Sequence, residues 1–123
     1  MSRALALAGV AVLAAAIAIV ARPATDSRTA VGPYTALAGV SGSVGTHTAC
    51  GAVITAATEG VAHPVLPCGV RLVLGYRGKR VLTHVIDRGP TAPGREFELS
   101  RALADRLGFT GTQRITWGYA PAP

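Results

Sequence analysis

The sequence predicts a small, mainly β domain in which about six short strands form a barrel with one short helix on its side. Fifteen glycines and eight prolines among 123 residues indicate many tight turns, which favours a β-rich fold over a helical bundle. Half of the residues are apolar but only 5% are aromatic, so the core must be built from Val, Leu, Ile and Ala. Short β-branched runs between the turns supply the strands.

The N-terminal segment, residues 1–22, is expected to lie outside this barrel. Arg3 gives it a positive start, and residues 4–21 carry no charge, as in a secretory signal peptide or a retained apolar helix that anchors the chain. Residues 16–18, Ala-Ile-Ala, fit a signal cleavage site, whereas the apolar run is at the short end for a membrane span, so both alternatives stay open. Under either, the domain is exported, and it is secreted or anchored to the outer face of the cytoplasmic membrane through this segment alone.

Three further regions follow the N-terminal segment. The polar residues 23–33 predict a linker, residues 34–119 the barrel domain and residues 120–123 a short tail. Strands in the barrel are predicted from apolar or β-branched runs at 34–40, 52–57, 70–74, 79–87 and 114–117.

The connections between these strands have their own signals. Residues 39–48 are dominated by Gly, Ser and Thr and predict a surface loop. Residues 61–69 contain two prolines, which forbid a helix and indicate a stiff, extended, edge-like connection. Residues 75–78, Gly-Tyr-Arg-Gly, predict the turn of a hairpin.

One short helix is predicted at Arg101–Leu107. Ser100 can cap its N-terminus and Gly108 can end it. An apolar stripe formed by Leu99, Leu103 and Leu107 gives the helix a face to bury.

The strand that ends at Asp87 carries the most informative pattern. Val81, Thr83, Val85 and Asp87 are predicted to share one face, and Leu82, His84 and Ile86 the other. Both faces are largely apolar, which predicts a strand that is buried on both sides or lines a small closed barrel. The chain then turns through Arg-Gly-Pro, so a single carboxylate is held at the end of a strand.

Charge and cysteine content exclude several classes of function. The net charge of +6 is scattered, with no interleaved aromatic platform, so nucleic-acid binding is not expected, and an anionic extracellular polymer or membrane suits it better. Cys50 and Cys68 are the only cysteines, and in an oxidising compartment they predict one disulfide. Because no CxxC or HxxxH partner accompanies them, no metal site is expected, and no cofactor is expected either.

Three segments in order resemble the rare lipoprotein A family. They are Ala-His-Pro-Val-Leu-Pro-Cys-Gly at 62–69, Ile-Asp-Arg-Gly-Pro at 86–90 and Gly-Arg-Glu-Phe-Glu-Leu-Ser at 94–100. The resemblance covers roughly residues 34–118. It implies a six-stranded double-psi β-barrel and a lytic transglycosylase, which cleaves the glycan strands of bacterial peptidoglycan without hydrolysis. The two cysteines resemble those of a secreted branch of the family, and the protein is expected to act as a monomer.

Glycan cleavage requires an acid for the leaving oxygen and a base for the attacking group, here the sugar's own hydroxyl. The resemblance carries these catalytic roles to Asp87 and His63, and the ordinary pKa of His is close enough to neutral for proton transfer. Arg88 and Arg95 are candidates for binding carboxylates of the wall peptide. Active relatives have a Glu where this chain has Ala52, and Glu59 is a candidate to replace it as a substrate-binding acid.

Other interpretations stay open for the same residues. Asp87 can accept backbone N–H groups in its turn, and His63 can be a packing residue beside Pro64. His84 and His47 are expected at the surface. For the whole domain, the alternatives are a non-catalytic, expansin-like glycan-binding module and a small structural or inhibitory secreted domain.

Overall fold

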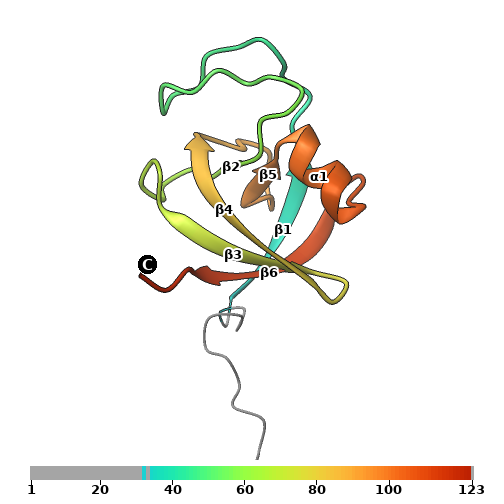
Figure 1. The fold of residues 1–123 in the computed structure, drawn as a ribbon. Coiled ribbons are helices and arrows are strands. Elements are labelled where there is room, and N and C mark those ends of the chain that lie inside the picture. The colour runs from blue at the N-terminus through green and yellow to red at the C-terminus, as the bar shows by residue number, and fades with distance from the viewer. Residues whose placement is uncertain (1–31, 33, 123) are drawn as a thin grey trace, which may run out of the picture.

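The computed structural model describes residue 32 and residues 34–122, so the expected signal or anchor at 1–22 and nearly all of the expected linker lie outside the described residues. Within this part of the chain, six strands close into a barrel in the order β1-β5-β2-β4-β3-β6, with one helix beside it (Figure 1). The predicted fold class is therefore confirmed. In residue 32 and residues 34–122, no helix has the length and apolar character that crossing a membrane requires.

Among the described strands, only β3 and β4 are neighbours both along the chain and in the barrel, so the other consecutive strands are joined by crossover connections. The bounds of the elements are β1 Tyr34–Val40, β2 Val61–Ala62, β3 Arg71–Tyr76, β4 Lys79–Asp87, β5 Phe97–Leu99, α1 Arg101–Leu107 and β6 Gln113–Tyr119. Two pairs, β1 with β5 and β2 with β4, are parallel, and the remaining pairs are antiparallel. The β3–β4 hairpin turns at Arg77 and Gly78, both with positive φ (45° and 78°), which matches the twist of the two strands.

The barrel interior is filled by alternating side chains from all six strands. The largest fully buried strand residues are Phe97, Leu72, Leu74, Leu99, Ile115, Val61 and Val85, and Leu103 of α1 is equally buried. The aliphatic core expected from composition is thus present, with Phe97 packed edge-on against Trp117 at 5.2 Å between ring centroids.

Helix α1 has the predicted bounds and both predicted caps. The Ser100 hydroxyl accepts from the Leu103 N–H, and Gly108 ends the helix in the left-handed conformation (φ 66°). Leu103, Ala104 and Leu107 are buried against the barrel, so the apolar stripe packs the helix onto it.

The structure differs from the predicted elements at three places. Residues 52–57 are not a strand: only Val53 forms an isolated bridge, with His47, and Thr55 and Thr58 bond to local backbone and to each other instead of to a neighbouring strand. Conversely, β2 forms inside the expected edge-like connection, and β5 was not predicted. Both are two or three residues long, too short for a pattern, and pairing with strands on both sides stabilises them.

Strand β4 is buried on one face only. Val81, Thr83 and Val85 point into the barrel, whereas Leu82 and His84 are exposed. This corrects the expectation of a strand with two buried faces and leaves the alternative, a strand that lines a closed barrel.

The end of β4 contains an irregularity that determines where Asp87 points. Val61 pairs with Val85 but Ala62 pairs with Asp87, so β4 has one extra residue, Ile86, as in a β-bulge. Paired residues share a face, so Asp87 does not share the face of Val81, Thr83 and Val85, as alternation predicted, but joins Ala62 on the outside of the barrel.

Candidate functional site

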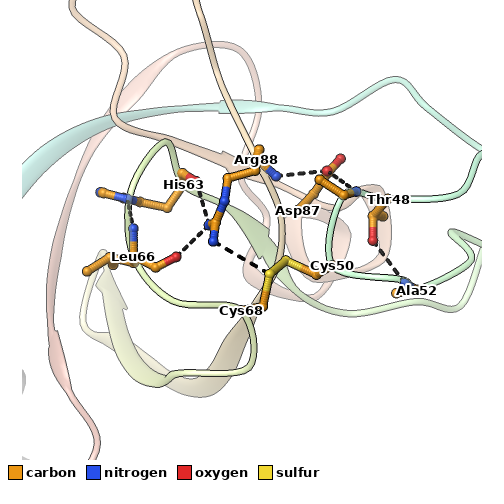
Figure 2. Close-up of a disulfide and its surroundings, with 9 residues drawn as sticks. Thr48, Cys50, Ala52, His63, Leu66, Cys68, Asp87 and Arg88 are labelled. Carbon is orange, nitrogen blue, oxygen red and sulfur yellow. Dashed lines mark hydrogen bonds between the residues drawn. A yellow bond between two sulfur atoms is a disulfide. The ribbon is translucent and has the colours of Figure 1, made fainter.

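Asp87 ends β4 at a small cleft on the outer face of the barrel, lined also by Ser41, Ala62 and Glu98. Its Oδ1 accepts hydrogen bonds from the backbone N–H groups of Ala49 (2.9 Å) and Arg88 (2.8 Å) (Figure 2). Among the described residues, no hydrogen bond to the other oxygen, Oδ2, is present. One oxygen thus positions the carboxylate and leaves the second for a ligand.

Glu98 brings a second carboxylate to this cleft. It lies in β5 between the fully buried Phe97 and Leu99, and it pairs with Ala62, which in turn pairs with Asp87. Two strand spacings separate the Cα atoms of the two acids, about 10 Å, with only a methyl group between them. The alternation of Glu96 and Glu98 with buried residues is the sequence signal that could have placed Glu98 here.

His63 follows β2 and is buried (5% exposed). Its Nδ1 accepts from the N–H groups of Val65 (3.1 Å) and Leu66 (3.0 Å), so the neutral ring carries its proton on Nε2. Nε2 lies 3.6 Å from Oε2 of Glu96, and the ring packs against Phe97 at 4.7 Å.

The pKa of His63 is lowered from its ordinary value. Burial is the largest cause, because it disfavours the charged ring. Glu96 opposes this shift, and Arg88 adds to it. The imidazole is therefore held neutral near pH 7. The acid that faces it is Glu96, which lies in the motif at 94–100 and for which the motif predicted no role.

The backbones of His63 and Asp87 lie side by side, but their side chains do not meet. The His63 N–H donates to the Asp87 carbonyl (3.2 Å). Figure 2 shows the ring and the carboxylate pointing in opposite directions, with the Arg88 side chain between them. Both residues lie in the described part of the chain, and no hydrogen bond joins their side chains.

Arg88 holds the loop that follows β2. Its Nη1 donates to the carbonyl of His63 (3.3 Å) and to that of Leu66, and its Nη2 contacts Sγ of Cys68 (3.5 Å) (Figure 2). The predicted Cys50–Cys68 disulfide is present. Because Cys50 adjoins the amide that bonds Asp87, the disulfide fixes both loops around the carboxylate.

Of the remaining predicted site residues, Arg95 lies on the same outer face as the Asp87 cleft and Glu59 does not line that cleft. Arg95 lies over Gly39, where an added Cβ would approach its Nη1 to 2.9 Å, and Gly39 pairs with Glu98, so Arg95 shares the outer face with the cleft. Glu59 instead forms an ion pair with Arg106 (2.7 Å) and does not line the cleft. Ala52 donates its N–H to the Thr48 hydroxyl (3.0 Å) and brings no acid.

Comparison with known proteins identifies the family. Residues 38–119 match the family model described as lytic transglycolase, which is most of the barrel. The chain belongs to this family. Family membership and the closed six-stranded barrel confirm the double-psi β-barrel that the motifs implied.

Two individual proteins are similar to this chain, one in sequence and one in fold. The endolytic peptidoglycan transglycosylase RlpA of Yersinia pestis is 38% identical over 73 residues, which is 58% of this chain and 20% of that protein. The chain thus spans about a fifth of the length of this relative. Among solved structures, the Streptomyces papain inhibitor has a TM-score of 0.53 and 23% identity, covering 71% of this chain and 96% of that chain, a likeness of fold.

Proposed function

We propose that this domain is exported and cleaves peptidoglycan glycan strands as a lytic transglycosylase, with Asp87 as the principal acid/base group. The observation that carries the proposal is the Asp87 carboxylate, whose Oδ1 is fixed by two N–H donors and which lines a cleft together with Glu98. Membership of the lytic transglycolase family and the similarity to the peptidoglycan transglycosylase RlpA support it.

The proposed reaction consumes no water. Asp87, in its protonated form, gives its proton to the glycosidic oxygen as the bond between that oxygen and the anomeric carbon breaks. The Glu98 carboxylate stabilises the positive charge on the sugar ring. A hydroxyl oxygen of the same sugar then bonds to the anomeric carbon, its proton returns to Asp87, and an anhydro sugar is left.

His63 enters the proposal as a second acid/base group that acts through Glu96. Its Nε2 proton faces the Glu96 carboxylate, and its Nδ1 is occupied by two amide N–H groups. Proton exchange with Glu96 is therefore the one route that this orientation of the ring favours. Arg95, beside Glu98 on the outer face, is proposed to bind substrate carboxylates.

The test is digestion of purified bacterial sacculi with the purified domain, with products identified by mass spectrometry. We expect anhydro-muramyl products, their loss in Asp87→Asn, and a large reduction in Glu98→Gln. Asp105→Asn is the matched control, because Asp105 is an exposed carboxylate on α1. Equal product from Asp87→Asn and the control would refute the assignment of Asp87.

A second candidate function is a non-catalytic, expansin-like glycan-binding module. The observation that favours it is Ala52, which brings no carboxylate where active relatives carry Glu. The same incubation separates the two functions. Sedimentation of the domain with sacculi without any released fragment would exclude the enzyme and support the binder.

A further inference from the structure

A second cleft, of about 460 Å³, lies at the β3–β4 hairpin and the adjoining part of β6. Four exposed cationic side chains line it, and no carboxylate of the described residues does. The four are Arg77, Lys79, Arg80 and Arg114. Clefts of about 300–1,000 Å³ are the usual size for binding ligands. Four like charges in so small a space repel one another, so a ligand that carries several negative charges stabilises this cationic cleft.

The cationic cleft lies at the opposite end of β4 from Asp87. Lys79 begins the strand and Asp87 ends it, about 25 Å further along. Figure 1 shows the hairpin turn at one end of the barrel and the arrowhead of β4 at the other. Arg114 also lines a neighbouring cleft that contains Glu96, whereas Arg77 and Lys79 do not. A ligand of the cationic cleft can therefore bind without entering the site at Asp87.

The cleft is lined by backbone and cations, not by exposed apolar surface. Gly75, which has no side chain, pairs with Arg80 of β4 on one side and with Thr116 of β6 on the other. The Thr116 hydroxyl donates to the Gly75 carbonyl (3.4 Å). The apolar members of the lining, Tyr76 and Ile115, are buried. A lipid surface needs exposed apolar side chains to insert, and a polymer of sugar acids gains from exposed aromatic faces, so both fit this cleft poorly.

We propose that the cationic cleft binds an anionic polymer of the cell envelope whose units are joined by phosphodiesters. In such a polymer the charge lies in the backbone, so binding orders no charged side chain of the ligand. The guanidinium of Arg77 lies 5.4 Å from the centre of the Tyr76 ring, which restricts its orientation. Its planar fork matches the two non-bridging oxygens of a phosphodiester, and Lys79 adds a point charge. The inference depends on export of the domain and not on cleavage at Asp87.

The test measures binding of the purified protein to poly(glycerol phosphate), with polyglutamate as the carboxylate polymer for comparison. The variant Arg77→Asn/Lys79→Gln removes two cations of the cleft, and Asn tolerates the positive φ at position 77. Its control, Arg71→Gln/Arg101→Gln, removes two exposed cations outside the cleft and has the same net charge. We expect the cleft variant to bind poly(glycerol phosphate) about tenfold more weakly, and the control within about twofold of the unmodified protein.

The comparison of the two polymers tests the chemical class of the ligand. Polyglutamate carries more charge per unit length, so attraction by charge alone favours it. The unmodified protein should nevertheless bind poly(glycerol phosphate) more tightly, because each carboxylate of polyglutamate lies at the end of a flexible side chain that binding must order. Tighter binding of polyglutamate would show that the cleft does not select phosphodiesters.

The remaining outcomes contradict the inference in distinguishable ways. Equal weakening in both variants would show that general charge, not the cleft, attracts the polymer. No weakening in the cleft variant would exclude the cleft. Weakening of its binding to phosphatidylglycerol vesicles but not to the polymer would identify a lipid surface as the ligand, and comparison with the control cancels any contribution of residues 1–22. Thermal unfolding of each variant verifies that the barrel is intact.

Discussion

At the scale of single residues, His63 links the candidate site to the core. Its ring closes the loop after β2 by accepting two amide N–H groups, and it packs against Phe97 inside the barrel. Protonation would place a hydrogen on Nδ1, where the two N–H donors already point. The loop conformation therefore depends on the neutral ring.

This dependence predicts a loss of stability in acid. The His63 pKa in the folded state lies below 6.5, so the unfolded chain takes up the proton first as the pH falls. The contribution of His63 is complete above about pH 6.5 and is lost as the pH falls from there through the lowered folded pKa. His63→Asn keeps an acceptor near the two N–H groups but does not titrate. In urea unfolding from pH 7.5 to 4.5, the difference between the unmodified domain and this variant should shrink toward acid pH. A difference independent of pH would contradict the prediction.

Gly39 permits another test at the residue scale. Gly39→Ala would displace the end of the Arg95 side chain, which is flexible, so the free energy of unfolding should stay within about 1 kcal/mol. Binding to sacculi should weaken as in Arg95→Ala if Arg95 contacts substrate. Normal binding by Gly39→Ala and weak binding by Arg95→Ala would mean that the position of the guanidinium over Gly39 is not the binding position.

At the scale of elements, prediction from sequence succeeded where the local signal was strong. The cap residues Ser100 and Gly108 mark α1, and the Gly-Tyr-Arg-Gly stretch at 75–78 marks the β3–β4 hairpin. Prediction failed where only pairing with neighbouring strands defines the element. Strands β2 and β5 are too short to show an alternation of apolar and polar residues. The extra residue in β4 is visible only in the register of β4 with β2. For the same reason alternation wrongly grouped Asp87 with Val81, Thr83 and Val85 on one face.

The Ser100 side chain joins α1 to the start of β2, so we expect its removal to lower the free energy of unfolding measurably. Its buried hydroxyl accepts both the Leu103 N–H (3.4 Å) and the Gly60 N–H (3.1 Å). Ser100→Ala leaves two buried donors without that acceptor, so the free energy of unfolding should fall by about 2 kcal/mol. Urea unfolding measures it, with the exposed neighbour Arg101→Ala as control. A loss under about 0.5 kcal/mol would show that other groups satisfy these donors.

At the scale of the whole molecule, the barrel strands β4 and β5 carry Asp87 and Glu98, and the loops attached to the barrel supply the groups that hold them in place. The core could be predicted because aliphatic residues alternate with polar ones along the strands, and the aliphatic residues face inward. The partners of the site could be predicted only in part, because Ala49, Glu96 and Glu98 come from segments far from Asp87 in the sequence. The motifs identified Asp87 itself, while the acids around it required the closed barrel.

The Cys50–Cys68 disulfide connects these loops, which predicts two separable effects of its removal. Its 18-residue separation corresponds to about 3 kcal/mol of stabilisation, because the cross-link restricts the unfolded chain. In Cys50→Ser/Cys68→Ser the global free energy of unfolding should fall by about that amount. The Ala49 amide, which donates to Asp87, should in addition lose its protection from hydrogen exchange under conditions where the amides of β3 stay protected.

Hydrogen-exchange rates of single amides show whether the disulfide stabilises only the barrel as a whole or also orders the loop at Asp87. If the disulfide acts only on the unfolded chain, the Ala49 amide and the β3 amides lose protection in parallel. If it also orders the loop, Ala49 exchanges faster by a larger factor, and glycan cleavage falls in the variant even at temperatures where the barrel is folded. Unchanged protection at Ala49 would mean that the Asp87 hydrogen bond and the Arg88 contacts hold the loops without the disulfide.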